Sequence, residues 1–364
     1  MKHGRIRVGL ARNLKRSGPL AGSMPVLNIA MIGSDELAKE IGKSSDQRDV
    51  HTYVHKENAE DGSQRILSLI RPARFPERLP PFLEALGVAR AGFIEVKAID
   101  AALGEALVAF SSAGMERGLY AINPLDDGWV DEEQVAALIQ QAGLSSWHRV
   151  EVDGIDIREK LMKMLDEMLP ELTAEATMPL IIPIDQHFNV KGIGLVAIGY
   201  VQQGSVSVHD ELLALPSEGT ANARSLQVMD DDVQTAVAGD RVGIAMRNAD
   251  EAWLSTGAIL IHLPTPEKNI EDVAPLPLAS TSATRVKVEK NPFQRRQLVV
   301  GDVVHISSDL QFVVGRITEV EDDYLDIKWD SPILIRIDGP GRALLNQLDS
   351  SPRVIGRITE LIQK

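Results

Sequence analysis

The feature that most constrains the fold is a change of pattern near Pro170. Before this residue, apolar runs alternate with segments whose apolar side chains recur at helical spacing. After it, short β-rich segments follow one another, separated by Gly, Asp and Asn. Alternating strands and helices predict a mostly parallel sheet with helices on both faces. Many short strands without helices predict a closed barrel or a sandwich, so we expect an α/β domain followed by β domains.

Apolar periodicity divides the first part of the chain into alternating strands and helices. The expected strands cover residues 26–32, 49–54, 65–70, 91–98 and 120–122. The expected helices cover residues 35–43, 81–86, 101–112, 132–142 and 156–169. Because the first helix lies between the first two strands, we expect a β-α-β unit at the start.

The second part is rich in strand-forming residues. Its expected strands cover residues 180–184, 194–202, 212–216, 223–229, 241–247 and 258–263. A linker with several prolines then leads to another β-rich block, from about Arg285 to the end. The pattern predicts domains at residues 24–172, 175–268 and 280–364.

Residues 1–23 carry six basic side chains and no acidic one. They lack the continuous apolar segment of a signal peptide. We interpret them as a disordered basic arm, or as an overextended gene start with Met24 as the true initiator.

Composition excludes several classes of site. The chain has no cysteine, which removes disulfides, thiolate metal sites and cysteine nucleophiles and suits a reducing cytoplasm, the expected location. No stretch approaches the roughly 20 apolar residues that cross a bilayer, so no membrane partner is expected. The formal net charge of -14 repels nucleic acid, so any RNA contact needs a local basic patch.

Two motifs in the second part point to a known family. The first reads KGIG at 191–194, then LVAIGYVQQGSVSVHDEL at 195–212, and the second reads AGDRVGIAMR at 238–247. In order and spacing they resemble the second domain of elongation factor Tu. Gly192 and Gly194 suit a tight turn into a strand. The closing SPRVIGRI at 351–358 resembles the last strand of the third barrel in selenocysteine-specific elongation factor and the gamma subunit of archaeal initiation factor two.

The resemblance to the translational GTPases implies a complete plan. Its fold would be a degenerate P-loop GTPase-like α/β domain followed by two β-barrels, the first of them similar to domain 2 of elongation factor Tu. It also implies GTP or GDP as candidate cofactors, and the ribosome, tRNA or other translation factors as partners.

A phosphate-binding loop requires G-x-x-x-x-G-K-[ST] after a strand. After the first expected strand the chain reads GSDELAKE, from Gly33 to Glu40. Gly33 and Lys39 match the motif, but Ala38 replaces the second glycine and Glu40 replaces the Mg²⁺ ligand. We interpret the segment as a helix capped by Ser34.

A second apparent match follows at Gly42-Lys43-Ser44. Here the position of the first glycine is occupied by Leu37. Because Leu37 and Ile41 have helical spacing, Gly42 is interpreted as a helix C-cap rather than part of a phosphate loop.

The motif for hydrolysis, D-x-P-G-H in translation factors, corresponds to RPARF at 71–75. Arg71 replaces the aspartate that supports Mg²⁺, Arg74 replaces the glycine that senses the γ-phosphate, and Phe75 replaces the histidine that positions water. The chain is therefore not expected to hydrolyse GTP by the family mechanism, and no catalytic residue is assigned. As an alternative, Arg71 and Arg74 hold a different anion without Mg²⁺.

The guanine-reading motif N-K-x-D corresponds to Asn123-Pro-Leu-Asp126, with proline in place of lysine. Asp126 could still accept hydrogen bonds from guanine, but the segment is more typical of a turn after a strand. A vestigial nucleotide site would consist of Gly33, Lys39, Asn123 and Asp126. No cofactor is expected to be required.

No metal site is expected either. His51, Tyr53 and His55 alternate along one face of a strand, but no third ligand is evident, and we interpret this face as solvated. The acidic run 230–232 is interpreted as a solvated turn.

One dense basic patch stands out in the C-terminal block. It comprises Arg285, Lys287, Lys290, Arg295 and Arg296, with Glu289 among them. The expected RNA- or partner-binding residues are Gly192, Gly194, Arg285, Lys287, Arg295 and Arg296. The hypothesis is an elongation factor-like pseudo-GTPase that binds the ribosome or tRNA through its barrels. Two alternatives are an active GTP-binding translation factor with an atypical phosphate loop and an interaction scaffold outside translation.

Overall fold

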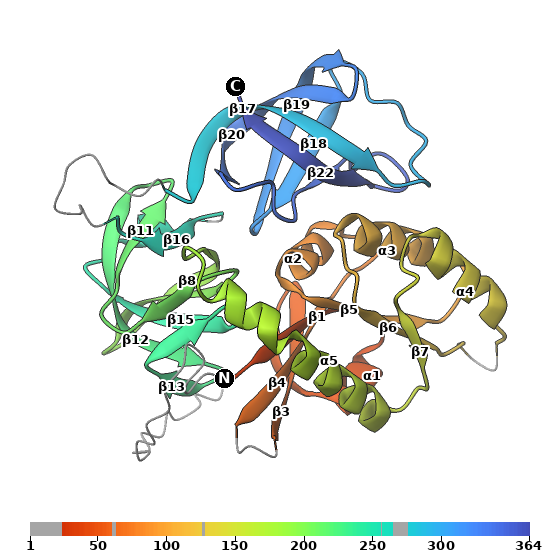
Figure 1. The fold of residues 1–364 in the computed structure, drawn as a ribbon, viewed down its shortest axis with the longest axis horizontal. Helices are drawn as coiled ribbons and strands as arrows, with labels where there is room; N and C mark the ends of the chain where they lie inside the picture. Colours follow the sequence, from red (N-terminus) through yellow and green to blue (C-terminus); the bar gives the residue numbers. More distant parts are fainter. Residues whose placement is uncertain (1–23, 60–62, 126–127, 256, 265–275) are drawn as a thin grey trace.

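The computed structural model describes residues 24–364 except 60–62, 126–127, 256 and 265–275. Both expectations for residues 1–23 concern residues outside this range. Figure 1 shows an α/β domain beside one β-barrel, with a second barrel above both. The expected fold class, an α/β domain followed by two barrels, is confirmed.

The α/β domain is built on a seven-stranded sheet of order β2-β3-β4-β1-β5-β6-β7. The strands are β1 (Val26–Ile32), β2 (Lys43–Gln47), β3 (Val50–Asn58), β4 (Gln64–Pro72), β5 (Ala91–Val96), β6 (Gly118–Ile122) and β7 (His148–Val150). β1 pairs in parallel with β4 and β5, and β6 pairs in parallel with β5 and β7. The sheet is therefore mostly parallel, as predicted.

The expected β-α-β unit at the start is wrong. After α1 (Asp35–Ile41) the chain enters β2 at the sheet edge and turns back into β3, which runs antiparallel to β2 and β4. The sequence analysis missed β2 because KSSDQ carries no apolar residue. An edge strand exposed to solvent has no need of one.

Helices cover both faces of the sheet. They are α1, α2 (Pro80–Val88), α3 (Ala101–Ser112), α4 (Glu132–Gln141) and α5 (Gly154–Glu175). α1 and α5 share one apolar cluster with the sheet, and α2, α3 and α4 share another. α5 continues through Pro170, beyond its expected end, because Met168 and Leu172 stay buried while Pro170 faces outward.

The first barrel closes in the order β11-β16-β8-β9-β15-β12 and back to β11. Its strands are β8 (Ile182–Val190), β9 (Gly194–Tyr200), β11 (Glu211–Leu215), β12 (Gly219–Val228), β15 (Arg241–Arg247) and β16 (Ile259–His262). β13 (Asp231–Val233) extends the sheet at β12, and β10 (Ser205–Ser207) pairs with β14 (Thr235–Val237). The short helix η1 (Glu251–Leu254) precedes β16.

The second barrel closes in the order β17-β20-β19-β18-β21-β22. Its strands are β17 (Leu278–Lys290), β18 (Val303–Ser308), β19 (Gln311–Glu321), β20 (Tyr324–Arg336), β21 (Leu344–Asn346) and β22 (Val354–Gln363). The interior is aliphatic apart from Trp329. Among the described residues, no helix combines the length and apolar character needed to span a membrane.

Candidate functional site

The segment that corresponds to the phosphate loop is almost entirely helical. Only Gly33 and Ser34 separate β1 from α1. The Ser34 hydroxyl accepts a hydrogen bond from the Leu37 N–H at 3.3 Å, which is the N-cap expected from the sequence. Two residues cannot wrap a chain of phosphates as the longer loop of the family motif does.

Gly42 ends this helix. Its N–H donates to the Ala38 carbonyl at 3.0 Å, in agreement with the C-cap interpretation. Its φ of -148° is extended, so a left-handed conformation is not the reason for glycine. A Cβ here would lie only 3.0 Å from the Val54 nitrogen, so the close approach of β3 is the reason.

A buried carboxylate lies at the start of α1. Glu95, near the end of β5, is 5% exposed. Its Oε2 accepts from the Ser34 N–H at 2.5 Å, and its Oε1 accepts from the Asn123 side-chain amide at 2.6 Å. Lys97 Nζ lies 3.9 Å from Oε2. The free N–H groups at the start of a helix attract anions, and here the chain supplies the anion itself.

Neighbouring charged groups are also engaged within the chain. Lys39 forms an ion pair with Asp35 one turn earlier, and the Tyr53 hydroxyl donates to the same carboxylate. Arg71 Nε donates to the Gly33 carbonyl at 2.6 Å. The hydrogen bonds from Lys39 and Tyr53 lower the pKa of Asp35, while burial and the contact with Asp35 raise the pKa of Tyr53 to about 12.

The structure therefore brings together only some of the residues expected to form a nucleotide site. Asn123 donates to Glu95, and Gly33 lies against the same side chain, since a Cβ added at Gly33 would come within 3.1 Å of the Glu95 Cβ. Lys39 is one turn away and turned toward Asp35. Asp126 lies outside the described residues. Arg74 is exposed, whereas Arg71 is half-buried, so the structure gives no sign of the two arginines sharing one anion.

The strand face of His51, Tyr53 and His55 is only partly solvated, since both histidines are half-buried, and the sequence interpretation is wrong for Tyr53. Tyr53 is fully buried in the cluster formed by α1, α5 and the sheet, because α1 covers this side of β3. Within the described residues, no three His, Asp or Glu side chains are grouped so as to hold a metal ion.

The basic patch of the C-terminal barrel is largely neutralised. Arg285 binds Asp326 through two nitrogens, at 2.7 and 3.1 Å, and Glu321 at 2.9 Å. Lys287 lies 3.7 Å from Asp323, and Arg296 lies 3.3 Å from Asp302.

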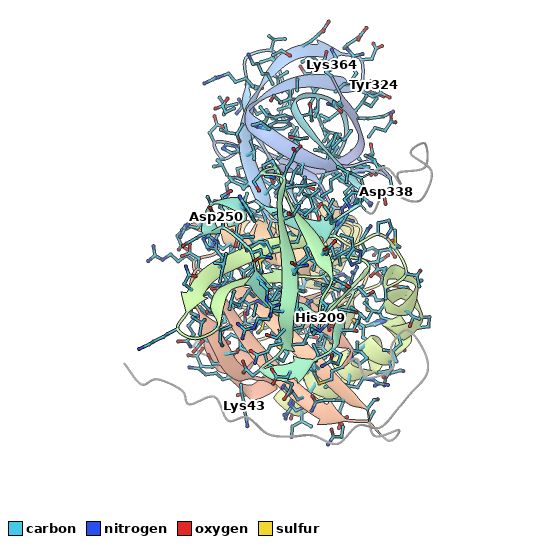
Figure 2. All side chains as sticks on the ribbon, turned by 90° about the vertical axis from the view of Figure 1, so that its left-hand side faces the viewer. Lys43, His209, Asp250, Tyr324, Asp338 and Lys364 are labelled. Carbon is cyan, nitrogen blue, oxygen red and sulfur yellow. The ribbon has the colours of Figure 1, made fainter. Side chains whose placement is uncertain are left out.

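Three of these acidic partners could not be found from the local sequence because they lie far along the chain. Glu321, Asp323 and Asp326 belong to the β19–β20 hairpin, which folds back beside β17. Figure 2 labels Tyr324 of this hairpin and Lys364 at the outer end of the barrel. Across the described residues, Lys290 and Arg295 are the two basic side chains of the patch without an ionic partner.

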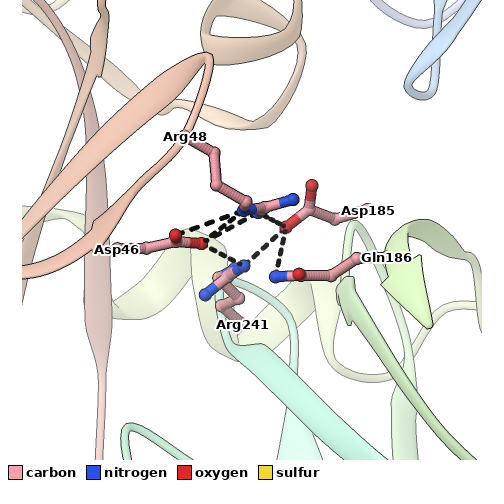
Figure 3. Close-up of polar contacts among 5 residues, drawn as sticks. All are labelled: Asp46, Arg48, Asp185, Gln186 and Arg241. Carbon is pink, nitrogen blue, oxygen red and sulfur yellow. Dashed lines mark hydrogen bonds and ion pairs between the residues drawn. The ribbon is translucent and has the colours of Figure 1, made fainter. Parts of the chain in front are cut away.

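A second ionic cluster joins the α/β domain to the first barrel (Figure 3). Arg241 of β15 lies 2.5 Å from Asp185 of β8 and 3.5 Å from Asp46 of β2. Arg48 lies 2.8 Å from Asp46 and 3.4 Å from Asp185. The Arg241 guanidinium also covers the ring of Tyr200, at 5.7 Å from its centroid. Arg241 belongs to the AGDRVG motif, so this motif residue serves a contact between domains.

Comparisons with known proteins were made for both sequence and fold. No family model matches the chain. Uncharacterized protein MJ0325 of Methanocaldococcus jannaschii is 27% identical over 311 residues, which cover 85% of this chain and 92% of that protein. The selenocysteine-specific elongation factor of the same organism is 33% identical over 116 residues, 32% of this chain. The one from Mus musculus is 26% identical over 157 residues, 43% of this chain. These matches span 24% and 25% of the two elongation factors.

Solved structures extend the likeness to nearly the whole chain. The apo form of translation elongation factor SelB from Methanococcus maripaludis gives a TM-score of 0.70 at 18% identity, covering 94% of this chain and 80% of that one. Its complex with the GTP analogue GPPNHP gives 0.71 at 18%, covering 94% and 79%. A bacterial selenocysteine-specific elongation factor gives 0.69 at 18%, covering 93% and 58%. The fold is that of these elongation factors, and the resemblance to translational GTPases is confirmed at this level.

Proposed function

Starting from a fold shared with selenocysteine-specific elongation factors, we propose that this chain is an elongation factor-like pseudo-GTPase. On this proposal it binds the ribosome or a tRNA through its barrels and does not require GTP. The observation that carries the proposal is the two-residue loop between β1 and α1, whose Ser34 N–H is already bound to the Glu95 carboxylate.

Glu95 lies at the position where folds of this kind bind their ligands. In an open α/β sheet, ligands bind outside the carboxyl ends of the strands, where neighbouring strands connect in opposite directions. The chain after β1 leads to the β2-β3-β4 side of the sheet, and the chain after β5 leads to β6 on the other side. The crevice between β1 and β5 is therefore such a point. Glu95 fills it, and Asp35 and Glu36 add negative charge in the first turn of α1. A triphosphate placed there would meet carboxylates instead of free N–H groups.

The first test is calorimetric titration of the chain from Met24 with GTP and GDP, each with and without Mg²⁺. We expect no binding at millimolar nucleotide. A GTP-binding elongation factor measured under the same conditions is the positive control. Micromolar binding would contradict the proposal and favour the active GTP-binding factor with an atypical loop at Gly33–Lys39.

The variant Glu95→Gln separates two causes of the expected lack of nucleotide binding, the negative charge of Glu95 and the short loop. It removes the negative charge but keeps an oxygen that accepts from Ser34. If charge alone excluded nucleotide, this variant would gain binding. We expect no gain, because only Gly33 and Ser34 are available to wrap phosphates.

For the partner, the tip of the β8–β9 hairpin is the best-supported surface. Gly192 and Gly194 have φ of +86° and +101°, a region that favours glycine. A Cβ added at either position would meet no atom within 4 Å, so both are open to a partner. Beside them Phe188 is 40% exposed, Ile193 is 37% exposed and Lys191 is exposed. An exposed aromatic next to a cation suits stacking on a nucleotide base. Because Arg285 and Lys287 are ion-paired, we place less weight on the basic patch.

Co-sedimentation with ribosomes and gel shift with tRNA test this part. The double variant Phe188→Ser/Lys191→Glu is expected to weaken binding about tenfold, the loss of one or two central contacts. The matched control is Lys163→Glu on α5, a highly exposed lysine of the α/β domain. Absence of binding to both ribosomes and tRNA would sink the proposal, and pull-downs free of ribosomal components would favour a scaffold outside translation.

A further inference from the structure

The C-terminal barrel is fixed to the α/β domain by Arg353. Its Nε lies 2.7 Å from Oε1 of Glu105 on α3, and its Nη2 lies 2.5 Å from Oε2. Its backbone N–H donates to the same carboxylate at 3.1 Å, and Nη2 also donates to the Pro76 carbonyl at 2.5 Å. The side chains of Arg353 and Glu105 are only 17% and 12% exposed. A shielded two-point contact of this kind is specific in geometry as well as strong.

A second arginine of the same barrel, Arg342, reaches the end of α2. It donates to the carbonyl of Ala89, the C-cap residue of that helix. Burial, together with the nearby Arg90, lowers the pKa of Arg342 to about 10, so the guanidinium stays charged at neutral pH. A positive charge suits the carbonyl end of a helix, which explains why this site accepts a half-buried arginine.

Apolar packing continues across the same boundary. Leu344 and Val354 of the barrel belong to one cluster with Phe82 of α2 and Phe110 of α3. The charged contacts therefore accompany an apolar core that the two domains share.

The first barrel contacts both the C-terminal barrel and the α/β domain. Arg336 of β20 donates to the Gln203 side chain at 3.0 Å while its other nitrogens bind Asp309. Arg90 of the α/β domain donates to the Gln202 carbonyl at 2.9 Å. With the cluster of Figure 3, each of the three bodies contacts both others.

We propose that Arg353 and Arg342 form an arginine latch that holds the C-terminal barrel in one fixed position on the α/β domain without nucleotide. The atoms that the latch contacts by hydrogen bonds belong to Pro76, Glu77, Ala89 and Glu105, and none belongs to the β1–α1 loop or to Asn123. Because these contacts do not include the crevice at Glu95, we expect the latch to hold whether or not that crevice is occupied. This inference does not depend on the proposed function and can fail or succeed independently of it.

Single-molecule energy transfer tests the latch. Because the natural chain has no cysteine, Gln140→Cys on α4 and Asp322→Cys on the β19–β20 turn give two defined dye positions, both exposed. We expect a single transfer population that GTP, GDP and Mg²⁺ leave unchanged. A shift with nucleotide, or two populations in this latched chain, would overturn the proposal.

The unlatched chain carries Glu105→Gln and Arg353→Gln in the same labelled background. We expect the fraction of molecules in a second, separated population to rise roughly tenfold or more, because a shielded ion pair is lost. The matched control is Arg117→Gln/Glu171→Gln, an exposed ion pair within the α/β domain, which should leave a single population. Arg353→Lys keeps the charge without the fork and should give an intermediate fraction, even if the double variant folds poorly. A folded double variant with one unchanged population would contradict the latch.

Discussion

At the scale of single residues, electrostatic partners decide which charges remain for binding. Asp326 is the clearest case, since hydrogen bonds from Arg285 and Lys364 hold its pKa well below the ordinary value. Its side chain is only 4% exposed. A lowered carboxyl pKa contributes stability above the pKa of the unfolded chain, near 4, and loses it as pH falls toward the folded value. The basic patch is thus a structural cluster at neutral pH.

Asp326→Asn should therefore destabilise the protein at pH 7 by about 2 kcal/mol, the range for hydrogen bonds to charged groups. Below about pH 4 the difference from the parental chain should shrink, because Asp326 is then protonated in the unfolded chain but still charged in the folded one, so folding must release a proton. Urea unfolding at pH 7 and pH 3 measures this. Asp323→Asn, at an exposed site in the same hairpin, is the control and should change stability little. An equal loss at both pH values would refute the charge-based account.

At the scale of elements, α1 shows how a helix replaces a loop. It has only seven residues, so its own backbone gives it little stability. The cap at Ser34, the carboxylate of Glu95 and the burial of Leu37 and Ile41 hold it in place. A local sequence pattern was enough to predict the cap.

Ser34→Ala should cost about 1 kcal/mol by removing the cap to Leu37. Ser34→Thr retains a hydroxyl and should cost only a few tenths. Thermal unfolding followed by circular dichroism would compare the two variants. If alanine and threonine have equal effects, the hydroxyl is not acting as a cap.

At the scale of the whole molecule, patterns within one segment were predictable and contacts between segments were not. The sequence analysis found α3 and β15 with the bounds that the structure has, since each has a strong apolar period. It missed β7, β10, β13 and β14, which have three residues each and no period to detect. Glu95 meets Ser34 across 61 residues. Its one local signal is a carboxylate inside the apolar run GFIEV at 92–96.

The buried carboxylate at Glu95 also bears on how the protein behaves in a changing cell. A protein that must bind a ligand gains folding stability in proportion to the logarithm of the free ligand concentration. If this chain binds no nucleotide, as we propose, it has no such dependence. On this arrangement, the folded fraction would be the same in a cell rich in guanine nucleotides and in one depleted of them.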